Sequence, residues 1–266
     1  CMKQKPSFPA KVEGLAPKKA QLAKGSTQFR SSNKSSALDS FATLASGVGL
    51  DSTKVRQSMV QKLAEQGVQD EMLLRAFSTI ERHKFIDTAL ANQAYEDTSL
   101  PIGFGQTISK PNVIARMIEL LRQGKNLMIT GKLSRVLEIG TGCGYQAAIL
   151  GQVSKEVYSI ERIQGLYEKA KENLRPMRLP NIHLILGDGM LGFEQGAPYA
   201  GIISAAGGEN IPPAWLEQLA VGGRLVAPVA NAQSSQVLVV IDKMENSYKR
   251  SFLEPVHFVP LRSGVA

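Results

Sequence analysis

The sequence has little of what secreted, metal-binding or membrane-spanning proteins need. It contains two cysteines, Cys1 and Cys143, and neither has histidine or cysteine partners at the spacing of a zinc site. No run approaches the roughly 20 consecutive apolar residues that a membrane helix requires, and the first residues lack the apolar core of a secretory signal. We therefore expect a cytoplasmic protein that has no disulfide framework, no metal site and no membrane partner.

The net charge of +8 is concentrated at one end of the chain. Residues 1–53 hold eight Lys or Arg against three Asp or Glu, so they carry +5 and the rest of the chain carries only +3. These residues are rich in Lys, Ser, Ala, Gly and Pro and have no sustained apolar period. We expect residues 1–53 to form a disordered basic extension, either without a role or in weak contact with acidic partners. Residues 54–266 are expected to form a single domain with no specific nucleic-acid partner.

Apolar residues between Ser52 and Arg82 recur at three- and four-residue intervals, with a break at Gly67. This period predicts two short amphipathic helices. Residues 101–111 are interpreted as a loop, which leads into a third helix beginning near Asn112.

Short apolar runs and helical stretches alternate through the rest of the chain. The predicted strands are residues 136–139, 157–160, 183–186, 201–204 and 224–227, and the predicted helices are residues 145–153, 164–174 and 213–220. This alternation favours an α/β fold with a parallel sheet covered on both faces. The apolar runs at 236–242 and 256–261 have no helix between them, so they predict an antiparallel hairpin that completes the sheet.

The most informative segment is VLEIGTGCGYQ, residues 136–146. An apolar strand runs into Gly140, Gly142 and Gly144 and then into a helix, as in nucleotide-type sites where the backbone must turn sharply beside a ligand. The third glycine comes one residue too early for the dinucleotide fingerprint. Glu138 would repel a pyrophosphate but suits a ligand that carries an ammonium group. The pattern therefore argues against a nicotinamide-dependent dehydrogenase.

Two more acids follow the next two strands. Glu161 closes the second strand, and Asp188 follows the third in the run LILGDG. Ligands of open α/β sheets bind at the carboxyl ends of the strands, so we expect both acids to lie beside the glycine turn. S-Adenosylmethionine suits such a site because it has no phosphates, carries an ammonium and a sulfonium, and presents a ribose diol that a carboxylate can bind.

Together these motifs resemble those of the class I S-adenosylmethionine-dependent methyltransferases, and more closely those of the protein-L-isoaspartate O-methyltransferase family. The matching segments are IGFGQTISKP (102–111), VLEIGTGCGYQAAIL (136–150), SIERIQGL (159–166), GDG (187–189), GGRLVAPV (222–229) and FVPL (258–261). The first of these is the most specific, because very many methyltransferases share the glycine turn. The resemblance implies a Rossmann-like, mostly parallel sheet of seven strands with helices on both faces.

The resemblance also implies an activity. Members of the family transfer a methyl group from S-adenosylmethionine to the free α-carboxylate of L-isoaspartyl residues in damaged proteins and peptides, which starts their repair. The implied cofactor is S-adenosylmethionine, and the implied partners are isoaspartyl-containing proteins and peptides. We expect the protein to be a monomer.

Carried over residue by residue, the resemblance makes Ser109 the catalytic residue and places Ser109, Val259, Pro260 and Leu261 against the acceptor. The implied donor-binding residues are Gln106, Thr107, Ile108, Glu138, Gly140, Gly142, Glu161, Asp188 and Gly189. Of these, Glu138 would face the methionine part of the donor, Glu161 the ribose, and Asp188 with Gly189 the adenine.

The chemistry needs only modest help from the protein. A carboxylate is already ionised at neutral pH and a sulfonium is a good electrophile, so placement of the two reactants in line matters more than a strong base. Ser109 would orient the carboxylate by hydrogen bonding. Its alternative role is that of a helix N-cap before Pro111.

Two departures from the family keep other functions open. Ala200 stands where the family usually has Asp, and SAAGGEN (204–210) replaces a more usual TAAAPEIP-like stretch. A non-catalytic protein of the same fold is one alternative, and a class I methyltransferase with another acceptor is the second. A nucleic-acid base methylase is disfavoured because the NPPY- or DPPY-like run after the fourth strand is missing. The contexts of the three histidines do not support a Ser-His-Asp triad.

Overall fold

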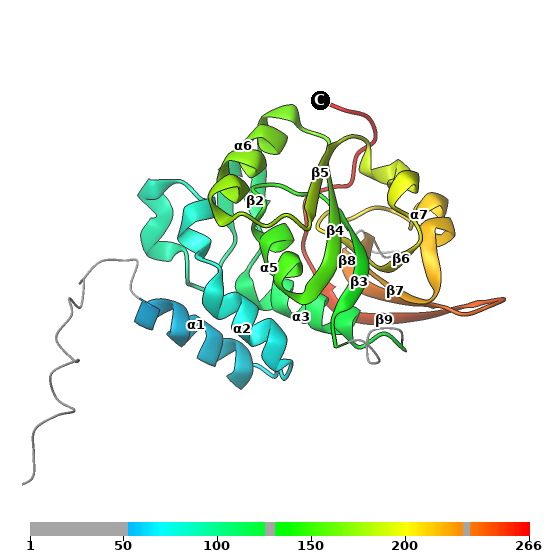
Figure 1. Ribbon diagram of the computed structural model, residues 1–266, viewed down its shortest axis with the longest axis horizontal. Coiled ribbons are helices and arrows are strands. Elements are labelled where there is room, and N and C mark those ends of the chain that lie inside the picture. Colours follow the sequence, from blue (N-terminus) through cyan, green and yellow to red (C-terminus); the bar gives the residue numbers. More distant parts are fainter. Residues whose placement is uncertain (1–52, 126–130, 231–234) are drawn as a thin grey trace, which may run out of the picture. The chain divides into compact units, whose positions relative to one another are not determined.

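The computed structural model describes residues 53–125, 131–230 and 235–266 (Figure 1). All but the last residue of the predicted extension, residues 1–53, lies outside these ranges, so disorder there stays a prediction. The first described element is a helix that begins at Thr53. Within the described ranges, none of the helices is long and apolar enough to cross a membrane.

Helices and strands alternate as the apolar pattern predicts. The α-helices are α1 (Thr53–Glu65), α2 (Glu71–Thr79), α3 (Pro111–Arg122), α5 (Tyr145–Val153), α6 (Gln164–Leu174) and α7 (Pro213–Gln218). The strands are β1 (Leu100–Gly103), β2 (Gln106–Ile108), β3 (Leu133–Ile139), β4 (Ser154–Glu161), β5 (Ile182–Leu186), β6 (Tyr199–Ser204), β7 (Leu219–Ala230), β8 (Gln236–Lys243) and β9 (Tyr248–Val256). Short 3-10 helices are η2 (Arg82–Phe85), η3 (Thr88–Gln93), η4 (Arg175–Met177), η5 (Gly189–Leu191) and η6 (Glu194–Gly196).

Seven of the strands form one sheet in the order β5-β4-β3-β6-β7-β8-β9. Neighbours from β5 to β7 are parallel, whereas β8 is antiparallel to both β7 and β9. The predicted fold, a mostly parallel seven-stranded sheet that ends in an antiparallel hairpin, is confirmed. The strand order reverses at β3, where β4 lies on one side and β6 on the other, and this is the point at which such sheets bind ligands.

Helices cover both faces of the sheet (Figure 1). On β3, Val136 belongs to the cluster that contains the buried side chains of α1, α2, α3 and α5, and Leu137 belongs to the opposite cluster with Trp215 of α7. Side chains alternate between the two faces along a strand, so a strand buried on both sides is apolar at successive positions. This explains why Val136 and Leu137 are apolar at successive positions of β3, in a run that is interrupted by Glu138.

The interpretation of residues 101–111 as a loop is wrong for most of that segment. β1 and β2 pair antiparallel and form a separate two-stranded sheet. Gly103, Phe104 and Gly105 all have positive φ at the turn between them. The strands contain only four and three residues, and Pro101 interrupts the first, so they are too short for a period of two to be recognised.

The second strand of the C-terminal hairpin is also displaced from its predicted position at residues 256–261. β9 ends at Val256, and it is a mostly exposed edge strand that contains Lys249, Arg250 and Glu254. Edge strands are commonly protected by charged side chains, which hide the apolar alternation. The apolar run after Val256 leaves the sheet instead.

Candidate active site

A cavity of about 660 Å³ opens at the carboxyl ends of β3, β4 and β6. A smaller one, about 390 Å³, shares four lining residues with it, namely Thr107, Ser109, Ala205 and Val259. Of the predicted site residues, those that line the larger cavity are Gln106, Thr107, Ile108, Ser109, Gly140, Gly142, Glu161, Gly189, Val259, Pro260 and Leu261. Residues distant in sequence are therefore brought together at one end of the sheet.

The three glycines of the turn have the backbone conformation that the sequence argument requires. Gly140, Gly142 and Gly144 have φ values of +88°, +57° and +91°, a region that side chains rarely adopt. A Cβ on Gly144 would also lie 3.1 Å from Leu174 Cδ1 of α6. The turn therefore lets α5 begin close to α6, with Gly140 and Gly142 exposed to the cavity.

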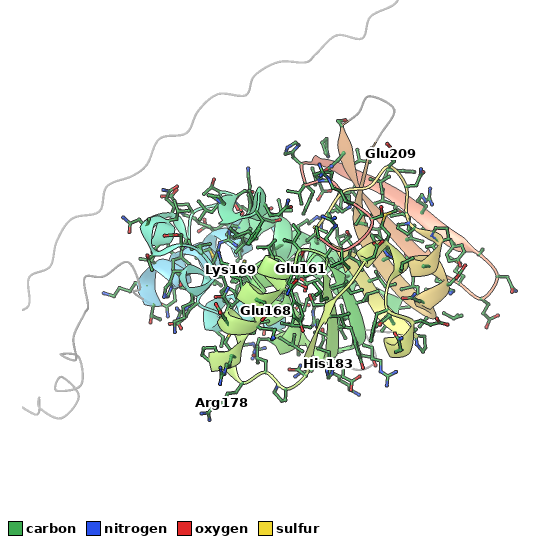
Figure 2. The ribbon with its side chains drawn as sticks, turned by 90° about the horizontal axis from the view of Figure 1, so that it is seen from above. Glu161, Glu168, Lys169, Arg178, His183 and Glu209 are labelled. Atoms are coloured by element: carbon green, nitrogen blue, oxygen red, sulfur yellow. The ribbon has the colours of Figure 1, made fainter. Side chains whose placement is uncertain are left out.

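Glu161 ties the glycine turn to the beginning of α6. Its Oε2 accepts a hydrogen bond from the backbone N–H of Gly142 at 2.8 Å, and its Oε1 accepts one from Ile163 N at 2.9 Å. The residue is only 4% exposed, and it lines the larger cavity. Figure 2 shows it well separated from His183 and Glu209. A carboxylate has about four acceptor positions, so Glu161 can accept further bonds from a ligand in the cavity.

Glu138 lies behind the cavity wall rather than in it. The residue is 0% exposed and is not among the cavity-lining residues. It accepts a hydrogen bond from Ser159 Oγ, which in turn is 2.6 Å from the hydroxyl of Thr141, a residue of the wall. Its second oxygen, Oε1, makes no full hydrogen bond among the described residues. Burial raises the pKa of Glu138 to about 8, although the nearby side chains of Ser159 and Gln146 oppose the rise.

This raised pKa predicts an unusual dependence of stability on pH. The carboxyl of Glu138 titrates near 4.5 in the unfolded chain and near 8 in the folded one, so between these values the folded state holds the extra proton. The contribution of Glu138 to stability is therefore lost as pH rises through this interval, by up to about 1.4 kcal/mol per pH unit. Urea unfolding of the wild type and Glu138→Gln, without donor, should show a stability difference that changes between pH 5.5 and 7.5. Parallel pH profiles for the two proteins would contradict it.

Asp188 occupies the N-cap position of η5. Its Oδ1 accepts from Met190 N at 2.8 Å, and its Oδ2 accepts from Gly264 N at 2.6 Å. The neighbouring Gly189 lines the larger cavity, and its carbonyl accepts a hydrogen bond from Trp215 Nε1 at 2.8 Å. Thus Gly189 contributes to the wall directly, whereas Asp188 lies beside it and also holds the end of the chain.

Residues 262–266, after the predicted acceptor segment, also contribute to the cavity through Arg262 and Ala266, and no sequence motif indicated this. Arg162 Nε donates to Gly264 O at 2.9 Å, and Arg162 Nη2 donates to Ser263 O at 3.4 Å. Ala266 exchanges backbone hydrogen bonds with Arg162 and Gln164 at 2.8 and 2.9 Å. The other cavity-lining residues, for which the sequence predicted no role, include Ile102, Phe104, Thr141, Cys143, Tyr145, Gln146, Arg162, Ala205, Ala206, Arg262 and Ala266.

The β1–β2 hairpin carries Ser109 to the junction of the two cavities. Lys169 Nζ of α6 donates to Ile102 O at 2.8 Å and so holds the hairpin against that helix. The N-cap position of α3 belongs to Lys110, and no side-chain capping bond is made there. The alternative role of Ser109 as the N-cap is therefore wrong, and Ser109 lines both cavities.

The segment Val259–Leu261 is fixed by the loop that departs from the usual family sequence. Gly207 N donates to Val259 O at 2.8 Å, and Leu261 N donates to Gly207 O at 2.8 Å. Gln236 brackets the preceding Phe258, accepting from its N–H at 2.7 Å and donating to its carbonyl at 3.1 Å. A Cβ on Gly207 would lie 2.4 Å from Gln236 Nε2. Gly207 therefore leaves the space that the Gln236 side chain occupies, and the SAAGGEN loop supports the cavity wall at Val259–Leu261.

Two of the three histidines, His83 and His183, have structural partners. His83 Nδ1 is 2.8 Å from the hydroxyl of Tyr95, and the ring of His183 is 4.8 Å from that of Tyr158. Across the described ranges, no group of three His, Cys, Asp or Glu residues could hold a metal ion.

Comparisons with known proteins extend the likeness to most of the chain. Residues 54–266 match the family model described as Protein-L-isoaspartate(D-aspartate) O-methyltransferase. A protein-L-isoaspartate O-methyltransferase from Methylibium petroleiphilum is 56% identical over 224 residues, which cover 84% of this chain and 82% of the relative. One from Burkholderia mallei is 48% identical over 258 residues, with 97% and 78% covered.

Two solved structures resemble the described fold. The first, a protein-L-isoaspartate O-methyltransferase, is 27% identical with a TM-score of 0.68, and the match covers 77% of this chain and 65% of that chain. The second is a putative enzyme of the same name from Plasmodium falciparum, in complex with S-adenosyl-L-homocysteine. It is 24% identical with a TM-score of 0.65, and the match covers 78% of this chain and 98% of that chain.

Proposed function

Because the chain belongs to the protein-L-isoaspartate O-methyltransferase family, we propose that its two adjoining cavities hold the two substrates of that reaction. The protein transfers a methyl group from S-adenosylmethionine to isoaspartyl residues. The larger cavity takes the methyl donor, and the smaller one takes the isoaspartyl segment of the acceptor. The observation that carries this assignment is the position of Ser109, which lines both cavities.

The residues around the larger cavity suit the donor. Gln146 lines the cavity next to the glycine turn, its Nε2 is buried without a full hydrogen bond among the described residues, and its side chain lies near the carboxyl of Glu138 behind the wall. An unsatisfied buried donor is costly, and the carboxylate of a methionine group in the cavity can accept from Gln146, directly or through water. Glu138, one layer behind, completes the polar surroundings of that group. Glu161 accepts bonds from the ribose hydroxyls, and Gly189 with the neighbouring Asp188 bounds the place for the adenine.

The smaller cavity suits an anionic acceptor. Lys110 and His257 are exposed and line it together with Ser99, and none of its lining residues is Asp or Glu. An exposed cation near the entrance attracts a carboxylate without holding it strongly. Val259 lies between the cavities, so the segment Val259–Leu261 borders both the acceptor and the transferred methyl group.

The protein's part in the reaction is placement. S-Adenosylmethionine supplies the methyl group: a carboxylate oxygen of the isoaspartyl residue bonds to the methyl carbon while the bond from that carbon to sulfur breaks. Ser109 donates a hydrogen bond to the carboxylate and fixes the attacking oxygen opposite the sulfur. A carboxylate and a sulfonium become a neutral ester and a neutral thioether, so a cavity that excludes water favours the transfer.

Transfer of labelled methyl from S-adenosylmethionine to a synthetic isoaspartyl peptide tests the function. We expect base-labile label on this peptide and none on the matching aspartyl peptide, because only the former has a free α-carboxylate at that residue. Donor binding without label on either peptide would favour the non-catalytic alternative. Label on another class of molecule alone would favour a different acceptor.

We further propose that isoaspartyl-containing proteins are the partners, that residues 54–266 are the catalytic domain, and that the protein works as a cytoplasmic monomer. The family match over residues 54–266 supports the domain assignment. Light scattering after size-exclusion chromatography tests the monomer, and fractionation of cells tests the location.

A further inference from the structure

Arg82 in η2 is a charged side chain in a place where charge is costly. The residue is 0% exposed, and no carboxylate among the described residues forms an ion pair with it, although Asp97 and the hydroxyl of Tyr145 lie near enough to favour its charge. Its Nε and Nη1 make no full hydrogen bond within the described chain. Burial of an ion carries a penalty of several kcal/mol that a close counter-ion would normally offset. An arginine at this position therefore calls for an explanation other than general stability.

The contacts that Arg82 does make connect the two halves of the site. Its Nη2 donates to Ser109 O at 2.8 Å and to Thr98 O at 3.3 Å. Its guanidinium carbon lies 5.0 Å from the centroid of the Tyr145 ring, within the range of a cation–π interaction. Tyr145 is the first residue of α5, directly after the glycine turn, and it lines the larger cavity. Arg82 thus touches both the wall of the donor cavity and the loop that carries Ser109.

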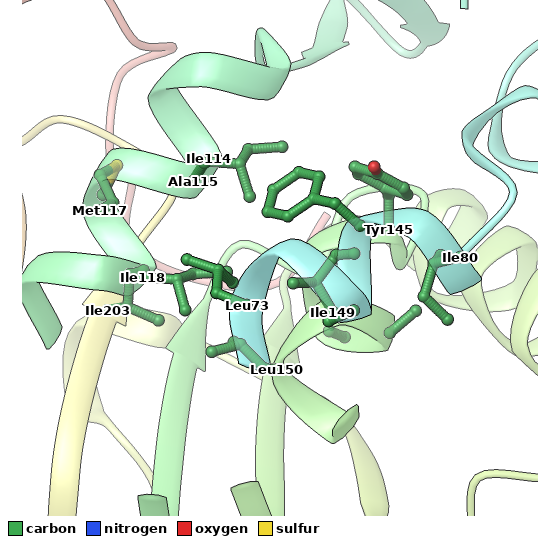
Figure 3. Packing of buried hydrophobic residues seen from close by; sticks show 14 of the residues in the cluster. Leu73, Ile80, Ile114, Ala115, Met117, Ile118, Tyr145, Ile149, Leu150 and Ile203 are labelled. Atoms are coloured by element: carbon green, nitrogen blue, oxygen red, sulfur yellow. The ribbon is translucent and has the colours of Figure 1, made fainter. Parts of the chain in front are cut away.

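Tyr145 is a rigid point of attachment. The rings of Phe77 and Phe85 meet the Tyr145 ring edge-on, with centroids 6.3 and 5.3 Å away. Figure 3 shows Tyr145 packed within the buried cluster that also contains Ile114 of α3 and Ile149 of α5. Next to Ser109, Ile108 is buried in the same cluster, whereas Ser109 itself is only partly buried. Arg82 adds a hydrogen bond from the core to the backbone carbonyl of Ser109 at this point.

We infer that Arg82 is a positioning residue for methyl transfer, which holds Ser109 at a set distance from the donor-cavity wall at Tyr145. The inference rests on the proposed function of the two cavities. Methyl transfer requires donor carbon and acceptor oxygen in line, and an error of about 1 Å can reduce a rate about 100-fold. Arg82 touches neither reactant, so its effect passes through the carbonyl of Ser109.

The first test is Arg82→Met, which keeps much of the apolar stem but removes the donors and the charge. We expect kcat on an isoaspartyl peptide to fall about 10-fold, the result of a shift smaller than 1 Å, with the donor Kd changed less than about 3-fold. Arg82→Lys keeps the charge and one donor group but loses the planar fork, so its kcat should fall between that of Arg82→Met and the wild type. A wild-type kcat in either folded variant would overturn the inference.

The second test asks whether Arg82 acts through Ser109. In the Ser109→Ala background, Arg82→Met should lower kcat by less than about 3-fold, because the hydroxyl that Arg82 positions is already gone. Losses that multiply fully in the double variant would show that the two residues act independently, and this would also overturn the inference.

Arg56→Met is a matched control for the loss of a largely buried arginine. Arg56 donates to Ser78 O at 2.6 Å and lies near Glu81, but it lines neither cavity. Its substitution should lower the unfolding free energy and leave kcat unchanged. If the wild type itself labels no isoaspartyl peptide, the proposed function fails. If the wild type is active and the Arg82 variants are equally active, only the role of Arg82 fails.

Discussion

Substitution of Glu161 by Gln should weaken donor binding about 100-fold while leaving kcat at saturating donor within about 3-fold of the wild type. The two oxygens of Glu161 already accept from Gly142 N and Ile163 N, so the amide of a glutamine must turn its N–H groups toward one of these donors. A hydrogen bond to a charged group contributes about 1.5–3 kcal/mol, or about 10- to 100-fold in affinity. Loss of a ribose contact and disturbance of the glycine turn therefore both lower the affinity for the donor, and their effects add.

Calorimetric titration with S-adenosyl-L-homocysteine and with S-adenosylmethionine would measure this loss of affinity. Glu168→Gln is the matched control, because it makes the same charge change on α6, where Glu168 is half-exposed and pairs with Lys171 at 3.0 Å. The control should bind the donor as the wild type does. An unchanged Kd for Glu161→Gln together with a large loss of kcat would remove Glu161 from the donor site.

The elements that could be predicted from the sequence are those whose burial produces a period. β3 to β7 carry apolar side chains toward helices on both faces, so each appears as a short apolar run. α5 and α6 begin and end at the predicted residues, since α5 follows the turn at Gly144 and both helices lie between buried strands. The parallel order of the sheet then follows from the alternation of strands with helices.

The elements that could not be predicted either lack an apolar period or carry apolar residues for a reason other than burial in the sheet. β9 lies at the edge of the sheet and exposes Arg250 and Phe252, so it lacks an apolar face that a pattern would reveal. The apolar character of Val259 and Leu261 reflects the cavity they line rather than a place in the sheet. In each case the environment comes from segments distant in sequence.

The same limit applies within the site. Motif position identifies Glu138 as an acid near the glycine turn, but only the packing of Ser159 and Thr141 places it behind the wall. Asp188 and Gly264 are 76 residues apart, and no local signal announces the hydrogen bond between them. The spacing of a motif therefore indicates which chemistry is present, whereas the partners of each side chain depend on tertiary contacts.

Substitution of Ser109 by Ala should reduce kcat by up to about 100-fold with little change in donor affinity. Within the described residues, no other hydrogen bond of the hydroxyl would mask the effect: Lys110 occupies the N-cap position of α3, and Arg82 binds the carbonyl of Ser109 rather than its side chain. A hydrogen bond to a carboxylate contributes about 1.5–3 kcal/mol, and here it also fixes the direction of attack.

Ser99→Ala is the matched control, since Ser99 is an exposed serine that lines only the smaller cavity. Single-turnover transfer to the isoaspartyl peptide, with the donor saturating, separates the chemical step from binding. Loss of kcat in Ser109→Ala but not in Ser99→Ala would mean that orientation of the carboxylate depends on the hydroxyl between the cavities. Equal activity of both variants would mean that the cavity walls alone align the reactants, and the catalytic contribution would then pass to Val259–Leu261 and the backbone around the junction.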